Sequence, residues 1–129
     1  MTQEQLVVAA IKACEGSYSP YSHFAVGAAV LAGSGKIYAG TNIENASYGA
    51  TMCAERVAIY KAVSEGEREI LALAVYADEE EGAIPCGMCL QVLSEFAGDI
   101  PVLVSGRSRM SSYTLYQLLP HPFKKKRCL

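Results

Sequence analysis

Two short stretches of the sequence contain the residue types that bind a metal ion. They read Cys53-Ala54-Glu55-Arg56 and Pro85-Cys86-Gly87-Met88-Cys89. Cys86 and Cys89 are three residues apart, so both thiols lie on one face in the first turn of a helix that begins at Pro85. Cys53 stands at the expected start of another helix. Helix N-termini favour thiolates, so three thiolates that meet where two helices begin predict a zinc site.

The number of protein ligands decides the role of such an ion. Structural zinc normally has four, whereas catalytic zinc has three and keeps a position open for water, whose pKa it lowers. Neither stretch contains a fourth ligand, and a closed site would need His23, His121, Cys14 or Cys128. Cys14 falls on the apolar face of an expected helix, which favours a small buried side chain. We therefore expect an open, catalytic zinc site.

Two charged residues accompany Cys53. Three thiolates and Zn²⁺ leave one excess negative charge, which needs a counter-charge in a low-dielectric pocket. Arg56 shares a helical face with Cys53 and can donate to the sulfurs; the alternative is a surface arginine in a salt bridge. Glu55 can place its carboxylate beside the metal-bound water as a general acid and base; the alternative is a solvated glutamate.

The composition sets limits on the class of protein. At 129 residues the chain is expected to form one domain, 1–129, and its 51% apolar and 19% charged residues indicate a globular protein with a core. A core of this size needs no metal to hold it, so any metal serves chemistry. The net charge of −2 includes a basic C-terminal tail at about 124–129. An acidic body with a short basic tail argues against nucleic-acid binding.

Cysteine count and hydropathy point to a location. Five cysteines, an odd number, argue against a disulfide framework. The N-terminal segment begins as an amphipathic helix without a charged leader region, and no stretch approaches 18 uninterrupted apolar residues. We expect a cytoplasmic protein that contacts no membrane.

The apolar periodicity predicts the elements that position the cysteines. Helices are expected over about 3–15, 52–64, 85–96 and 113–119, and strands over 24–31, 36–41, 70–77, 102–105 and near 107–110. Thr2 and Gln5 form a capping box, and Gly33-Ser34-Gly35 connects a hairpin. Each strand–helix–strand crossover favours a parallel pair. The order predicts an α/β fold, a three-layer α/β/α sandwich around a mixed five-stranded sheet.

With these motifs the sequence resembles the cytidine deaminases, the small homotetrameric zinc-dependent nucleoside deaminases. The resemblance covers nearly the whole chain. It also rests on Tyr18-Ser19-Pro20-Tyr21-Ser22, Val26-Gly27-Ala28-Ala29, Asn42-Ile43-Glu44-Asn45-Ala46-Ser47-Tyr48, Gln91-Val92-Leu93-Ser94-Glu95-Phe96, and Leu118-Leu119-Pro120 with Phe123. It implies hydrolytic deamination of cytidine and 2′-deoxycytidine to uridine and 2′-deoxyuridine in pyrimidine salvage, with release of ammonia and one Zn²⁺ per subunit.

The resemblance also implies a role for each matching residue. By this resemblance Cys53, Cys86 and Cys89 hold the zinc, and Glu55 shuttles protons. Phe24 packs against the base, and the backbone around Ala54, Cys86 and Cys89 recognises the base edge. Asn42 and Glu44 bind the ribose hydroxyls. Neighbouring subunits of a homotetramer complete the pocket through Ala46, Tyr48 and Phe123. Without the resemblance, Phe24 would be interpreted as core, and Asn42 and Glu44 as turn residues. Two positions depart from the family pattern: Leu90 stands where arginine is usual, and Met88 replaces a small residue.

Other functions stay open on the residues alone. One is deamination of a modified or antibiotic cytosine nucleoside, although the Asn42–Asn45 loop favours a plain ribose. A second is deamination of a base in transfer RNA. The acidic body argues against it, and so does Cys53, because those enzymes typically have a histidine at that position. The third is a non-enzymatic zinc or redox module with Cys86 and Cys89 as a dithiol pair, which would require neither Cys53 nor Glu55.

Overall fold

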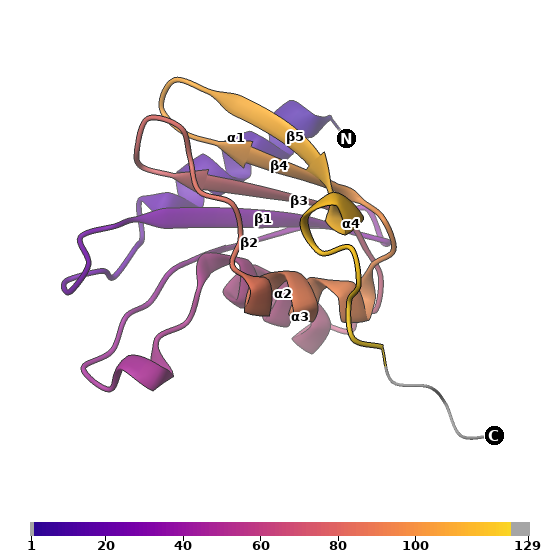
Figure 1. Cartoon of the computed structure of the whole chain (residues 1–129), viewed down its shortest axis with the longest axis horizontal. Helices are drawn as coiled ribbons and strands as arrows, with labels where there is room; N and C mark the ends of the chain where they lie inside the picture. Colours follow the sequence, from indigo (N-terminus) through magenta and orange to yellow (C-terminus); the bar gives the residue numbers. More distant parts are fainter. Residues whose placement is uncertain (1, 125–129) are drawn as a thin grey trace.

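The computed structural model describes residues 2–124, so the predicted basic tail lies outside the described residues except for Lys124. In chain order the elements are α1 (Gln3–Cys14), β1 (Val26–Ala32), β2 (Ile37–Thr41), η1 (Tyr48–Ala50), α2 (Ala54–Ser64), β3 (Ile70–Ala77), α3 (Gly87–Phe96), β4 (Pro101–Ser105), β5 (Met110–Thr114) and α4 (Leu115–Leu118) (Figure 1). All predicted elements but one match within about two residues. The capping box of Thr2 and Gln5 is also confirmed.

The five strands form one mixed sheet in the order β2-β1-β3-β4-β5, as predicted. β1 is antiparallel to both β2 and β3, β3 is parallel to β4, and β4 is antiparallel to β5. The expected parallel pair on either side of α2 does not form. The crossover after β2 passes β1 and places β3 on the far side of that strand, so β2 and β3 point the same way with β1 between them.

Helices cover both faces of the sheet, which confirms the three layers. On one face α1 packs Leu6 and Ala10 against Ala29 and Ala74. The opposite face carries α2 and α3 over the larger core, where Ile59, Leu90 and Leu93 are buried with Val30 and Val75. In Figure 1 α1 lies behind the strands, and α2 and α3 lie together below them. No helix within residues 2–124 combines the length and apolar character that a membrane crossing needs.

Two glycines let the helices approach the sheet closely. A Cβ on Gly27 of β1 would lie 1.9 Å from the Ala10 carbonyl oxygen, and one on Gly40 of β2 would lie 2.6 Å from the Ala58 nitrogen. Neither separation is possible for a side chain, so larger residues would push α1 and α2 outward. Gly40 thereby fixes the distance of α2, and of the site at its start, from the sheet.

Two predicted positions are wrong for reasons of local bonding. The last strand lies at Met110–Thr114, not near 107–110, because residues 106–109 form a turn in which Gly106 N–H donates to the Arg109 carbonyl. Pro85 precedes α3 and does not occupy its first turn. Cys86 is instead the N-cap, with extended backbone at ψ 163.

Candidate metal centre and active site

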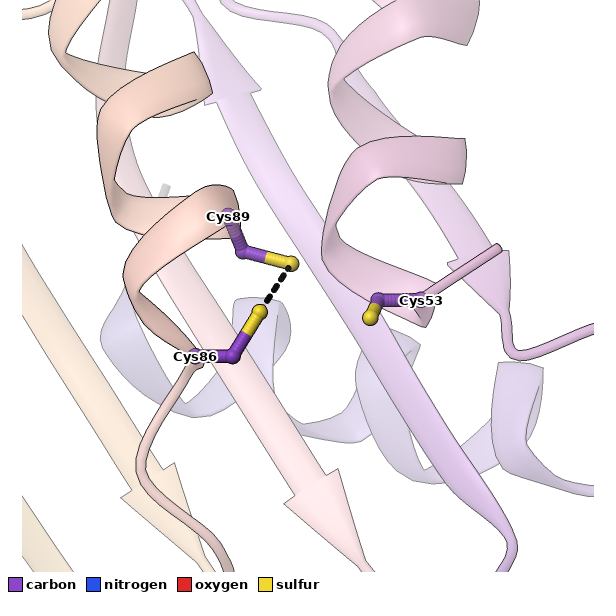
Figure 2. A group of neighbouring side chains, drawn as sticks. All are labelled: Cys53, Cys86 and Cys89. Atoms are coloured by element: carbon purple, nitrogen blue, oxygen red, sulfur yellow. Dashed lines mark hydrogen bonds between the residues drawn. The ribbon is translucent and has the colours of Figure 1, made fainter. Parts of the chain in front are cut away.

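The three cysteines lie where two adjacent helices begin. Cys53 is the N-cap of α2, Cys86 is the N-cap of α3, and Cys89 follows in the first turn of α3. Both N-cap residues have extended backbone, which places their side chains at the amide end of the helix. In Figure 2 all three sulfurs point into the gap between α2 and α3.

The spacing of the sulfurs fits a zinc ion. They all lie within 4.8 Å of one another, and Cys86 Sγ is 3.4 Å from Cys89 Sγ. A Zn–S bond of about 2.3 Å places the sulfurs of a tetrahedral centre about 3.8 Å apart. Among residues 2–124 the group of metal-ligating side chains comprises these three cysteines. The arrangement matches the open, three-ligand site that the sequence predicts.

None of the fourth ligands that a closed site would need joins this group among the described residues. His23 and His121 are absent from it, and Cys14 is buried at the end of α1. Cys128, the remaining possibility, lies outside the described residues.

Arg56 lies beside the sulfurs on the first turn of α2. Its Nη2 donates to Cys53 Sγ at 3.3 Å, and its Nη1 donates to Met88 Sδ at 2.9 Å. The guanidinium pKa is raised, chiefly by the hydrogen bond to Cys53. The arginine is therefore a fixed positive charge next to the thiol group.

The cysteine thiols do not ionise alike. Hydrogen bonds from Cys89 and from Arg56 lower the pKa of the Cys53 thiol to about 5. The pKa of Cys89 is raised, because its thiol donates to the Cys53 sulfur and because it is buried. Cys53 is thus the first of this pair to become a thiolate, and a divalent cation would draw the proton from the other.

Glu55 is a buried carboxyl group beside the cysteines. It is the second residue of α2 and only 6% of its surface is exposed. Burial raises its pKa to about 7, and the charge of Cys53 contributes in the same direction. Such a group exchanges protons near neutral pH, which is the property a general acid and base needs.

A pocket of about 250 Å³ opens in front of the thiols. Its inner end is lined by Cys53, Glu55 and Cys86. The remaining lining residues are Ser22, Phe24, Val26, Asn42, Glu44, Thr51, Met52, Ala54, Val75, Ala83 and Ile84. The lining therefore combines two of the three predicted metal ligands, Cys53 and Cys86, with residues from the predicted substrate-binding set: Phe24, Asn42, Glu44 and Ala54.

Asn42 is buried and holds three segments together. Its Oδ1 accepts from the Ser17 hydroxyl at 2.6 Å and from the Val26 N–H at 3.0 Å, and its Nδ2 donates to the Phe24 carbonyl at 2.7 Å. The side chain thus fixes the loop that carries Phe24, one wall of the pocket.

Glu44 performs a similar task on the outer side of the pocket. Its Oε1 accepts from the N–H groups of Tyr21 and Ser22 at 3.0 and 3.1 Å, and its Oε2 accepts from the Ser22 hydroxyl. The bond from Ser22 is the main reason why the pKa of this carboxyl is lowered. Glu44 is therefore a carboxylate at neutral pH, held at the mouth of the pocket.

The three residues predicted to act on a neighbouring subunit lie outside the pocket of their own chain. Ala46 and Tyr48 are exposed, and Tyr48 meets Tyr21 edge to face with ring centroids 6.0 Å apart. Phe123 is 75% exposed, and only its backbone is bound, through two hydrogen bonds with Gln91. Two aromatic rings thus project into solvent from a single chain.

Sequence reasoning missed several residues of the pocket wall. Ile84 is 53% exposed, yet it borders both this pocket and a second one beneath β5. Thr51 and Met52 line the approach to α2. A signal existed for Ile84, because an apolar residue directly before Pro85-Cys86 must lie near the metal ligand. No comparable signal marks Thr51 or Met52.

Comparisons with known proteins agree with this geometry. The family model for the cytidine and deoxycytidylate deaminase zinc-binding region matches residues 1–105. A cytidine deaminase of Sporosarcina psychrophila is 48% identical over 98% of this chain and 94% of its own length. The crystal structure of cytidine deaminase from Burkholderia pseudomallei superposes with a TM-score of 0.90, at 38% identity over 95% of this chain and all of that one. A blasticidin-S deaminase of Bacillus cereus is 34% identical over 74% of each chain.

Proposed function

Since this chain belongs to the cytidine deaminase family, whose members carry a zinc-binding region, we propose that it deaminates cytidine and 2′-deoxycytidine hydrolytically to uridine and 2′-deoxyuridine, with release of ammonia. One observation carries the proposal: three thiols cluster beside a buried carboxyl group, and a pocket lined by two of these thiols and by that carboxyl group is also lined by Asn42 and Glu44.

Cys53, Cys86 and Cys89 would hold one zinc ion per subunit, since their sulfurs are spaced for a common ion. Zinc with three protein ligands supplies an acidified water molecule in its open position. Arg56 offsets the excess negative charge of three thiolates, because its Nη2 already donates to Cys53 Sγ.

Glu55 would move the protons of the reaction. Its carboxylate would accept a proton from water and deliver it to N3 of the pyrimidine. It would then accept the proton of the new C4 hydroxyl group and deliver it to the amino group, which leaves as ammonia. Its position on the first turn of α2 supports this role, because it is buried and lines the pocket next to Cys53. Burial of Glu55 in surroundings of low dielectric constant would strengthen each of these interactions.

The other predicted pocket residues would hold the nucleoside. Phe24 packs against the base, and the backbone around Ala54, Cys86 and Cys89 reads the base edge. Asn42 and Glu44 bind the ribose hydroxyls; Glu44 is suited to accept from them because it is an oriented carboxylate at the pocket mouth. A deoxy analogue altered at the 3′ position should then bind poorly.

A homotetramer would complete the pocket. Ala46, Tyr48 and Phe123 would reach the site of a neighbouring subunit, and their exposure in the single chain supports this assignment. Exposed aromatic rings of this kind are common anchors at protein interfaces. The enzyme would serve pyrimidine salvage in the cytoplasm, where free thiols persist.

A direct assay tests the function. Purified protein of known zinc content is mixed with cytidine, and ammonia and the ultraviolet change of the base are followed together. We expect equal amounts of ammonia and uridine. Zinc-loaded protein that leaves cytidine intact would refute the proposal. If the same protein deaminated only a cytosine nucleoside antibiotic such as blasticidin S, the alternative favoured by the Bacillus cereus relative would replace it.

A further inference from the structure

A methionine contacts Arg56, the cation that lies beside the thiols. Arg56 on α2 and Met88 on α3 face each other across the gap between the two helices. The two amino groups of the guanidinium have different acceptors: Nη1 donates to Met88 Sδ at 2.9 Å, and Nη2 donates to Cys53 Sγ at 3.3 Å. Among the described atoms its buried Nε has no hydrogen-bond partner. Two sulfur acceptors therefore define the orientation of the guanidinium.

The chemistry of the acceptor matters. A carboxylate at position 88 would bind the guanidinium more strongly but would also neutralise its charge. A thioether is an uncharged, weak acceptor, so it directs one amino group and leaves the positive charge to the cysteine sulfurs.

The cluster has no other cation to rely on within residues 2–124. Arg56 is the only lysine or arginine there that donates a hydrogen bond to one of the three sulfurs. Leu90, directly after Cys89, is 4% exposed and packs in the apolar core, so it provides no charge. A rotation of Arg56 away from Cys53 would leave the excess negative charge of the metal centre unbalanced.

We propose that Met88 is a positioning residue of the metal centre: its thioether holds Nη1 of Arg56 so that Nη2 stays on the Cys53 sulfur. The inference rests on the proposed zinc site. It concerns retention of the metal and not the identity of the substrate.

The test compares two replacements of Met88. Met88→Leu conserves volume but removes the acceptor, whereas Met88→Gln restores an uncharged acceptor, its amide oxygen, on a chain of similar length. The readouts are the rate at which zinc passes to a chromophoric chelator and the thiolate-to-metal charge-transfer band of the Co²⁺-substituted protein. We expect Met88→Leu to release zinc roughly tenfold faster, at the lower limit for residues that orient metal ligands, and to shift the band. Met88→Gln should behave like the parent.

Two controls separate positioning from packing. Met110→Leu changes a methionine of similar exposure, 57% against 62%, on β5, and should leave both readouts unchanged. In an Arg56→Gln background Met88→Leu should have no further effect, because the group through which Met88 acts is missing. Far-ultraviolet circular dichroism of each variant checks that it is folded.

Each outcome bears on a defined claim. If the parent protein binds no zinc, both the proposed function and this inference fail. If it binds zinc and Met88→Leu retains the metal as the parent does, only the role of Met88 is refuted. The same holds if Met88→Leu accelerates release equally in the Arg56→Gln background, or if Met88→Gln behaves like Met88→Leu.

Discussion

The two ends of the pocket are built differently. At the inner end Cys53, Glu55 and Cys86 line the pocket and Cys89 lies beside them, and all four belong to the N-caps or first turns of α2 and α3. The outer end consists of loops whose polar groups are already engaged: Asn42 in holding the chain segments around it, and Glu44 in capping the loop at Ser22.

This difference in construction suggests that the inner end carries out the reaction and the outer end encloses the substrate. The starts of two helices place the proposed metal ligands and the proposed proton carrier within one chain. Asn42 and Glu44 hold the loops at the outer end, while Tyr48 and Phe123 are exposed and do not line the pocket. We therefore expect changes at the inner end to abolish chemistry, and changes at the outer end to weaken binding.

The largest effect is expected from removal of a metal ligand. Cys86→Ala should lower bound zinc far below one ion per chain and activity to background, because the two remaining sulfurs cannot hold a three-ligand site. Zinc content by elemental analysis and ammonia release measure the two effects. Cys14→Ala is the matched control, since it alters a buried cysteine outside the cluster. Full activity of zinc-free Cys86→Ala would break the distinction between the two ends.

Glu55→Gln should lower kcat by about 10²- to 10⁴-fold, because the amide has the shape of the carboxyl group but cannot carry the proton. Zinc content should stay at the parent level. Glu65→Gln, at the opposite end of the same helix, should leave kcat unchanged. Loss of zinc together with kcat would assign Glu55 a ligand or structural role instead.

At the outer end, Glu44→Gln should act mainly on KM. The loss of a charged acceptor should raise KM for cytidine roughly tenfold or more, with a much smaller change in kcat. Steady-state kinetics with cytidine and with a 3′-deoxy analogue measure this effect. The difference in KM between the two substrates should be smaller for the variant than for the parent. An equal fall of kcat and kcat/KM would instead place Glu44 in the chemistry of the inner end.

Phe123→Ala should raise KM several-fold if the ring covers the pocket of a neighbouring subunit, as an aromatic contact of ordinary strength would. Mixed oligomers provide a sharper test. When Phe123→Ala and Glu55→Gln chains are unfolded and refolded together, some pockets combine an intact Glu55 with an intact neighbouring Phe123. A population of sites with the parent KM should then appear. Its absence from mixtures that contain both chains would place Phe123 outside the neighbour's pocket.

The smallest effect on substrate choice is expected from Leu90→Arg. Its side chain would enter the core around α3, so the melting temperature should fall because a charge is buried without a partner. The ratio of kcat/KM for cytidine and 2′-deoxycytidine should change by less than about twofold, since Leu90 does not line the pocket. Leu90→Met is the volume-conserving control. A large change in that ratio would contradict the assignment of Leu90 to packing.

Local signals in the sequence predict most of the elements. The capping box at Thr2 and the apolar run Ile70–Ala77 mark α1 and β3 clearly. The last strand, Met110–Thr114, begins later than the sequence predicts, because its residues are mostly polar and partly exposed at the sheet edge. Its position depends on antiparallel pairing with β4 and on the turn before it, neither of which has an apolar period.

The sequence by itself determined the residue types of the site. Cys53 and Glu55 stand at the start of one helix and Cys86 and Cys89 at the start of another, and within each pair the residues are two or three positions apart. The tertiary structure alone decided how these two local motifs meet. The starts of α2 and α3 lie side by side because β3 pairs with β1 and because Gly40 lets α2 pack close to the sheet. The tertiary structure also places Arg56 against Met88, which is 32 residues away in the sequence. Such a contact depends on the packing of two helices, so no periodicity in the sequence predicts it.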